Sequence, residues 1–182
     1  ALWASGNIYL YKALFYNYVN IDDLNLFSTR TVAAGQGEPW ALGNDYNKIP
    51  LTADLRNALE SYNSVAFLVV KNDSIRYEEY WDSYGEGSLS NSFSVAKSII
   101  SILIGIAHDE GKIKSLDQPV CDYLPEFCDG QNKKLTIRHL LMMSSGLNYD
   151  ESYTSLFGPT TRAYYGTDLK KQMLSLDVVE EP

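Results

Sequence analysis

Basic residues and long apolar runs are scarce in this chain, and each scarcity excludes a class of protein. The 182 residues include 15 lysines and arginines against 23 aspartates and glutamates, a formal net charge of −8. A surface of that sign repels phosphate backbones, so nucleic acid is not an expected partner. The longest apolar stretch, residues 99–107, is interrupted by Ser101 and Gly105. It falls short of the roughly 18 residues that a membrane-spanning helix needs.

Cysteine is also scarce, since the chain has two, Cys121 and Cys128, at the ends of C-D-Y-L-P-E-F-C. This spacing lacks the further ligands of a zinc site, and we expect neither a metal nor a cofactor. We interpret the pair as two semi-buried free thiols. The alternative is a disulfide that closes a small loop, which requires an oxidising compartment.

The composition is otherwise that of a globular protein, with 45% hydrophobic and 21% charged residues. Residues 1–50 mix aromatic side chains with turn formers and show no sustained period. We interpret them as an N-terminal aromatic-rich arm that opens with a short helix, and residues 51–182 as a separate part. The first eight residues, A-L-W-A-S-G-N-I, carry no charge and are not a signal peptide, so we expect the numbering to begin after any leader.

From residue 51 the pattern predicts an α+β protein. Thr52 and Thr136 are candidate helix caps, and Asp168 is a third. An apolar, β-branched run and a second run after Asn72-Asp73 predict a hairpin. The expected elements are a helix from Thr52, strands 64–71 and 75–81, a buried helix from 94 to about 109, and helices near 136–145 and 168–177, with residues 147–166 irregular.

The hairpin has no further strand candidate in this sequence, and two strands alone are not a stable sheet. We therefore expect the chain to be the N-terminal portion of a longer protein. Its exposed sheet edge would be unpaired or paired with another copy, so self-association through that edge is an expected interaction.

Ser94 and Lys97 form an S-x-x-K at the start of the apolar helix. Residues three apart share one face of a helix, and the helix N-terminus favours negative charge on the serine oxygen. On so apolar a helix we expect Lys97 to be desolvated, which favours the neutral amine that can accept the serine proton. The alternative is a helix-capping serine and a lysine that extends to solvent, although a surface helix would carry more charge beyond Lys97.

The sequence N-S-F-S-V-A-K-S-I-I-S-I-L-I-G, residues 91–105, resembles the nucleophile helix of the serine β-lactamase and penicillin-binding superfamily. The segments L-D-Q-P-V, Y-L-P-E and L-T-I-R-H-L-L-M-M-S-S-G-L follow in that superfamily's order. They most resemble its class C β-lactamase-like branch, and M-S-S-G-L-N-Y-D-E-S-Y is similar to the 6-aminohexanoate-dimer hydrolase type. The resemblance covers residues 51–182.

The resemblance implies an incomplete β-lactamase/transpeptidase-like fold and gives several residues a role. Ser94 would be the acylated nucleophile and Lys97 its proton partner, with the Ser94 N–H as half of the oxyanion hole. Tyr153 would contact substrate, although it could instead be a surface loop aromatic. His139 more often packs or bonds to the backbone in this motif than takes part in catalysis.

The family also needs a later tyrosine and a K-T-G-like strand, which we do not find, so we expect this chain alone to be inactive. The implied substrate is a small amide, an ester or a β-lactam. Two alternatives are a protein that β-lactams acylate without turnover and a non-catalytic binding module. The family mostly works outside the cytoplasm, so a periplasmic or membrane-anchored location is expected.

Overall fold

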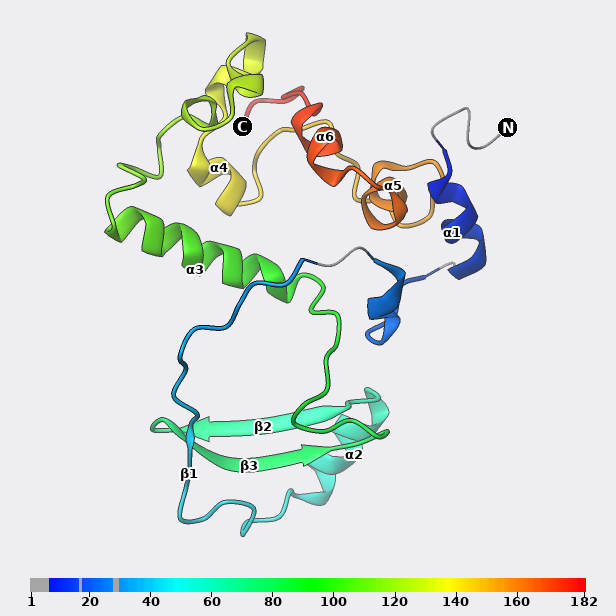
Figure 1. Cartoon of the computed structure of the whole chain (residues 1–182), viewed down its shortest axis with the longest axis vertical. Coiled ribbons are helices and arrows are strands. Elements are labelled where there is room, and N and C mark those ends of the chain that lie inside the picture. Colours follow the sequence, from blue (N-terminus) through cyan, green and yellow to red (C-terminus); the bar gives the residue numbers. More distant parts are fainter. Residues whose placement is uncertain (1–6, 17, 28–29) are drawn as a thin grey trace. The chain divides into compact units, whose positions relative to one another are not determined.

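The computed structural model describes residues 7–16, 18–27 and 30–182. These residues divide into two compact units, one made of Ala1–Phe27 with Asn91–Pro182 and the other of Ser28–Ser90. The smaller unit contains the sheet and the larger one is helical (Figure 1). The α+β class predicted from the sequence is therefore confirmed.

The smaller unit is built on a sheet with the strand order β1-β3-β2. β2 (Ala66–Lys71) and β3 (Ser74–Tyr80) form the predicted antiparallel hairpin, turning at Asn72-Asp73. The expectation that this chain offers no further strand was wrong, because β1 (Ala41–Leu42) pairs in parallel with the start of β3. A strand of two residues has no period that a sequence pattern could show.

Helix α2 (Ala53–Ser61) begins as predicted, because the Thr52 hydroxyl accepts a hydrogen bond from the Leu55 N–H at 3.3 Å. The helix is tied to β3 by Arg56, whose guanidinium donates two hydrogen bonds of 2.9 Å to the Glu79 carboxylate. A bidentate pair of this kind fixes orientation as well as distance. The helix and the hairpin therefore form one unit.

Helix α3 (Val95–Asp109) is the first helix after residue 91 in the larger unit. It ends as predicted, at Gly111, whose φ of 72° is in the left-handed region. The expectation that it is buried was wrong, because no residue of α3 is buried and Ile102 is 58% exposed. A helix that is apolar all round needs cover on all sides. Within its own unit, the elements described here do not supply that cover. In the described ranges, no helix is long and apolar enough to cross a membrane.

A core of Val120, Phe127, Leu135 and Val178 joins three short 3-10 helices to the last residues of the chain. The buried Asn132 amide closes this core, since its oxygen accepts from the Val178 N–H at 2.7 Å. The elements around it are η2 (Val120–Asp122), η3 (Pro125–Phe127), η4 (Gly130–Lys134) and α4 (Ile137–Leu141).

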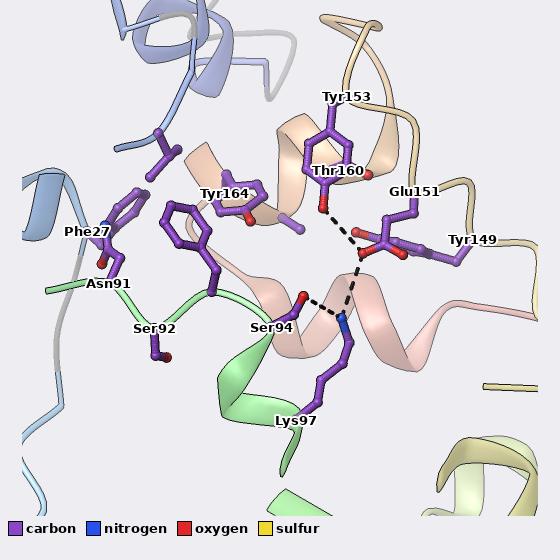
Figure 2. Close-up of a pocket in the computed structure, with 13 residues that line it drawn as sticks. Phe27, Asn91, Ser92, Ser94, Lys97, Tyr149, Glu151, Tyr153, Thr160 and Tyr164 are labelled. Carbon is purple, nitrogen blue, oxygen red and sulfur yellow. Dashed lines mark hydrogen bonds and ion pairs between the residues drawn. The ribbon is translucent and has the colours of Figure 1, made fainter. Parts of the chain in front are cut away.

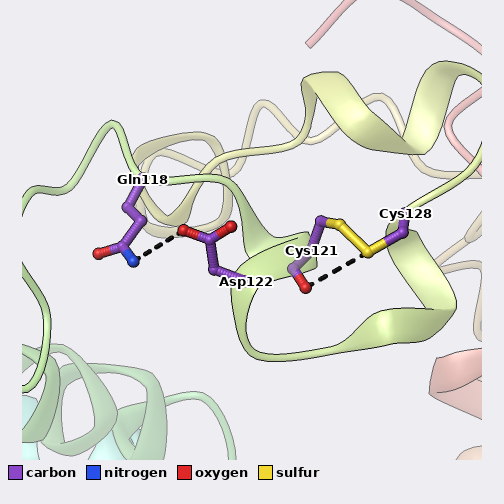
Figure 3. Close-up of a disulfide and its surroundings, with 4 residues drawn as sticks. All are labelled: Gln118, Cys121, Asp122 and Cys128. Carbon is purple, nitrogen blue, oxygen red and sulfur yellow. Dashed lines mark hydrogen bonds between the residues drawn. A yellow bond between two sulfur atoms is a disulfide. The ribbon is translucent and has the colours of Figure 1, made fainter.

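Cys121 and Cys128 are joined in a disulfide, with their Cα atoms 4.8 Å apart (Figure 3). The interpretation as free thiols was therefore wrong, and the alternative was right. η2 and η3 turn the chain back on itself, and this brings the two cysteines within the Cα separation that a disulfide allows.

Helix α4 begins at Thr136 as predicted, and α6 (Leu169–Leu174) at Asp168, whose carboxylate accepts from the Lys171 N–H at 3.0 Å. Both helices are shorter than predicted. The segment 147–166 is not all irregular, because α5 (Pro159–Tyr165) lies in it. Its sequence, P-T-T-R-A-Y-Y, is rich in β-branched and aromatic residues of modest helix propensity, so packing of Thr160 and Tyr165 decides its structure.

The predicted short N-terminal helix is α1 (Tyr9–Tyr16). Its Tyr9, Leu10 and Ala13 are buried with Tyr165 of α5 in a second hydrophobic core. A single 3-10 turn, η1 (Asp23–Leu26), follows it. The N-terminal residues thus pack into the same unit as α5.

Candidate active site

Ser94 and Lys97 meet at the start of α3. The Lys97 ammonium nitrogen donates a hydrogen bond of 3.0 Å to Ser94 Oγ. Among the described residues the Ser94 hydroxyl accepts no capping hydrogen bond from the helix. The capping role that the alternative gave to Ser94 is therefore wrong, although the Lys97 side chain is 53% exposed, as that alternative expected. The serine oxygen instead faces a group able to exchange a proton with it.

The backbone just before the serine adopts a conformation that is rare for a side chain of this size. Phe93 has φ 44°, in the left-handed region that non-glycine residues seldom occupy. Its carbonyl still accepts the Ala96 N–H at 3.2 Å, so the turn that leads into α3 begins at Phe93. Such backbone conformations persist where the surrounding structure enforces them and are frequent at functional sites.

Two residues of the D-E-S-Y segment complete the polar group around Lys97 (Figure 2). Glu151 Oε1 lies 3.8 Å from the Lys97 ammonium, and the Tyr153 hydroxyl donates to the same carboxylate oxygen at 3.4 Å. A continuous series of polar contacts thus links Ser94 to Lys97, Lys97 to Glu151, and Glu151 to Tyr153. The structure brings together all three residues that the sequence singled out.

Tyr153 takes part in these contacts as a neutral hydrogen-bond donor. Partial desolvation raises the pKa of its phenol, and the neighbouring Tyr164 and Glu151 raise it further. A phenol with a raised pKa keeps its proton at neutral pH. Tyr153 can therefore donate a hydrogen bond here, either to Glu151 or to a bound molecule.

A pocket of about 400 Å³ opens above Ser94. One side is polar, with Lys97 and Glu151, and the other is aromatic, with Phe27 and Tyr164 (Figure 2). A second pocket of about 260 Å³ also includes Ser94, Phe93 and Tyr164. This combination of an apolar surface with a few placed polar groups is typical of sites for small molecules.

The surroundings of Lys97 differ from the expectation. Its side chain is 53% exposed, so it is not desolvated in this structure. The reason is the open pocket on one side and the uncovered face of α3 on the other. The carboxylate of Glu151, also 53% exposed, supplies the counter-charge.

His139 is not among the residues that line this pocket. The ring nitrogen Nδ1 of His139 accepts a hydrogen bond from the Thr136 backbone N–H at 3.3 Å, and the backbone N–H of His139 donates to Thr136 Oγ1 at 3.2 Å. This reciprocal pair is a capping box, so His139 bonds to the backbone at the start of α4. Within the described residues no cluster of three or more potential metal ligands is found.

Glu151 was not among the residues predicted for the site, although it lies two residues before Tyr153 in the same motif. Nor were Val19 and Phe27, which reach the pocket from the N-terminal segment. Glu151 was within reach of sequence reasoning, since it lies in the same motif as Tyr153 and a carboxylate is a natural counter-ion for a lysine. Nothing in the local sequence of Val19 or Phe27 indicates a pocket.

A family model described as Beta-lactamase matches residues 51–182, which is more than half of the chain and contains Ser94, Lys97, Glu151 and Tyr153. The chain belongs to the Beta-lactamase family. The resemblance found in the sequence is confirmed, and the α+β architecture agrees with an incomplete β-lactamase-like fold.

The chain is also similar to a 6-aminohexanoate-dimer hydrolase from Paenarthrobacter ureafaciens, with 30% identity over 100 residues. The match covers 55% of this chain and 25% of that protein, so it spans about a quarter of the relative's length.

Proposed function

We propose that Ser94 is the nucleophile of a hydrolase that works through an acyl-enzyme. The observation that carries the proposal is the 3.0 Å hydrogen bond between Lys97 and Ser94 Oγ at the opening of a pocket. The family membership and the hydrolase relative support it.

In the proposed reaction, Ser94 Oγ attacks the carbonyl carbon of an amide or ester, and its proton passes to the neutral form of Lys97. The oxyanion that forms lies near the N-terminus of α3, where free N–H groups and the helix dipole favour negative charge. Collapse of this intermediate breaks the bond to the amine or alcohol, which leaves with a proton. Water then cleaves the Ser94 ester and releases the acid.

We propose a small amide, an ester or a β-lactam as substrate. The pocket of about 400 Å³ admits a molecule of that size, and its aromatic side suits a hydrocarbon portion. We also propose an extracytoplasmic location, supported by the disulfide between Cys121 and Cys128, because disulfides persist in oxidising compartments.

We further propose that turnover needs more than these 182 residues. The matched stretch covers 25% of the hydrolase relative, and catalytic groups that act as a unit lose activity together. The tests below therefore use the full-length protein that contains this sequence.

The decisive experiment is covalent labelling followed by peptide mass spectrometry. A fluorophosphonate or penicillin probe should add one mass to the peptide that contains Ser94. Ser94→Ala should abolish the adduct with a stability loss below about 1 kcal/mol, because the hydroxyl makes no cap to lose. Ser98→Ala and Ser101→Ala are matched controls on the same helix and should label at the wild-type rate.

Labelling of Ser98 or Ser101 in place of Ser94, or an undiminished adduct in Ser94→Ala, would contradict the proposal. A stable penicillin adduct without release of product would instead indicate a protein that β-lactams acylate without turnover. The same spectra distinguish the two, because turnover regenerates the unmodified peptide.

A further inference from the structure

The N-terminal segment lies outside the stretch that the family model matches, yet it forms part of the pocket around Ser94. The match begins at residue 51, whereas Val19 and Phe27 line the pocket that contains Ser94 and Lys97. Tyr18 and Val19 also line the second pocket beside Ser94. We infer that residues 18–27 form a wall of the active site, and that its apolar side chains Tyr18, Val19 and Phe27 determine which substrates the site prefers. This inference rests on the proposed function.

The wall is held in place by helix α1. Tyr9, Leu10 and Ala13 of α1 are each less than 8% exposed and share a core with Tyr165 of α5. The Arg162 guanidinium lies 5.5 Å from the centre of the Tyr9 ring, within the range of a cation–π contact. These contacts bury a whole helix face, so α1 anchors the residues that follow it.

The wall itself packs onto the same core. Val19 and Phe27 both lie against it, and the Phe27 ring stacks on that of Tyr165 with 6.4 Å between their centres. The Lys12 ammonium donates to the Leu26 carbonyl at 2.8 Å, which ties the end of the wall back to α1. The wall therefore has a defined position beside α5.

A third set of contacts joins the wall to the loop that carries the nucleophile. The Asn91 N–H donates to the Ile21 carbonyl at 2.8 Å, and the Asn91 amide nitrogen donates to the Asn20 carbonyl at 2.7 Å. Asn91 stands three residues before Ser94. Two hydrogen bonds to adjacent carbonyls fix the distance between the wall and the serine, as a specificity element requires.

The chemistry of the wall indicates what it contacts. Val19 and Phe27 offer hydrocarbon and aromatic surface, whereas the charged groups Lys97 and Glu151 line the same pocket. A substrate with its reactive carbonyl at Ser94 and an apolar chain against the wall satisfies both. The contact should favour esters and amides with longer acyl chains, since each additional methylene buried in an apolar pocket increases kcat/KM.

The test compares nitrophenyl hexanoate with nitrophenyl acetate as substrates of the full-length protein. Phe27→Ala should lower the ratio of kcat/KM for hexanoate over acetate by about tenfold, and Val19→Ala by a smaller factor. Phe15→Ala is the matched control, because Phe15 is an aromatic residue of α1 that is 73% exposed and does not line the pocket. It should leave the ratio unchanged.

An unchanged ratio in both wall variants, or an equal fall in Phe15→Ala, would overturn the inference while Ser94-dependent hydrolysis stands. If Phe27→Ala does not fold, as judged by its thermal melt, Val19→Ala decides the question. Hydrolysis that persists in Ser94→Ala would overturn the proposed function and the inference with it. A purely structural role of the wall would lower kcat/KM for both esters equally, and this result also counts against the inference.

Discussion

Glu151 Oε1 lies 3.8 Å from the Lys97 ammonium, which on its other side donates to Ser94. The lysine therefore lies between the Glu151 carboxyl group and the hydroxyl that gives up its proton in the proposed mechanism. A neighbouring carboxylate favours the charged form of an amine, whereas proton acceptance needs the neutral form. If Lys97 is the base of the proposed mechanism, we expect Glu151 to oppose activation of the serine while it keeps the lysine in position.

Glu151→Gln separates these two effects. Removing the negative charge should speed covalent labelling of Ser94 below neutral pH, by at most about fivefold, because exposed ion pairs contribute about 0.2–1 kcal/mol. The measurement is the labelling rate across a range of pH. Glu110→Gln is the matched control, because Glu110 pairs with Lys112 outside the pocket. A slower rate in Glu151→Gln would show instead that Glu151 serves mainly to position Lys97.

Lys97 variants test whether its proton transfer matters. Lys97→Ala should slow the labelling of Ser94 by about 100-fold or more, the usual contribution of a positioned general base. Lys97→Arg should not restore the rate, because a guanidinium keeps its proton in proteins. Rapid labelling of Lys97→Arg would show that the positive charge alone is sufficient. Lys112→Ala, which removes an exposed lysine outside the pocket, is the control.

Removal of the disulfide should destabilise the protein. Its loop is short, with seven positions separating Cys121 from Cys128, so the loss of chain constraint amounts to about 2–3 kcal/mol. The double variant Cys121→Ser/Cys128→Ser should unfold at lower urea concentration than the wild type. Addition of reductant should lower the wild-type midpoint and leave the variant unchanged. A wild-type midpoint that does not respond to reductant would contradict a stabilising disulfide.

The ion pair between Asp117 and Arg138 should make stability depend on pH. The hydrogen bonds from the Arg138 guanidinium, 2.6 and 3.0 Å long, lower the pKa of the Asp117 carboxyl below its ordinary value. A carboxyl whose pKa is lower in the folded state stabilises that state above its unfolded pKa, about 4, and the contribution is lost as pH falls through the folded pKa.

The melting temperature of Asp117→Asn should therefore be lower than that of the wild type at pH 6, and the difference should shrink as pH falls below about 4. Asp129→Asn is the control, since Asp129 makes no ion pair within the described part of the chain. A difference that stays constant down to pH 2 would show that the carboxylate charge plays no part.

Local signals in the sequence determined the starts of most helices and the chemistry at the centre of the site. Thr52, Thr136 and Asp168 cap helices where their side chains predicted. The S-V-A-K motif predicted that Ser94 and Lys97 lie on one helix face, because residues three apart are neighbours on the surface of a helix. Contacts within one turn depend on nothing further along the chain, so the sequence suffices for them.

The tertiary structure decided what depends on distant partners. It paired β1 with β3, joined Cys121 to Cys128, exposed the apolar face of α3, and brought Glu151 and Phe27 to Ser94. None of these contacts has a periodic signal, since each forms between segments whose local sequences are independent of one another. Each depends on how segments that are distant in the sequence pack together, and that is a property of the whole unit.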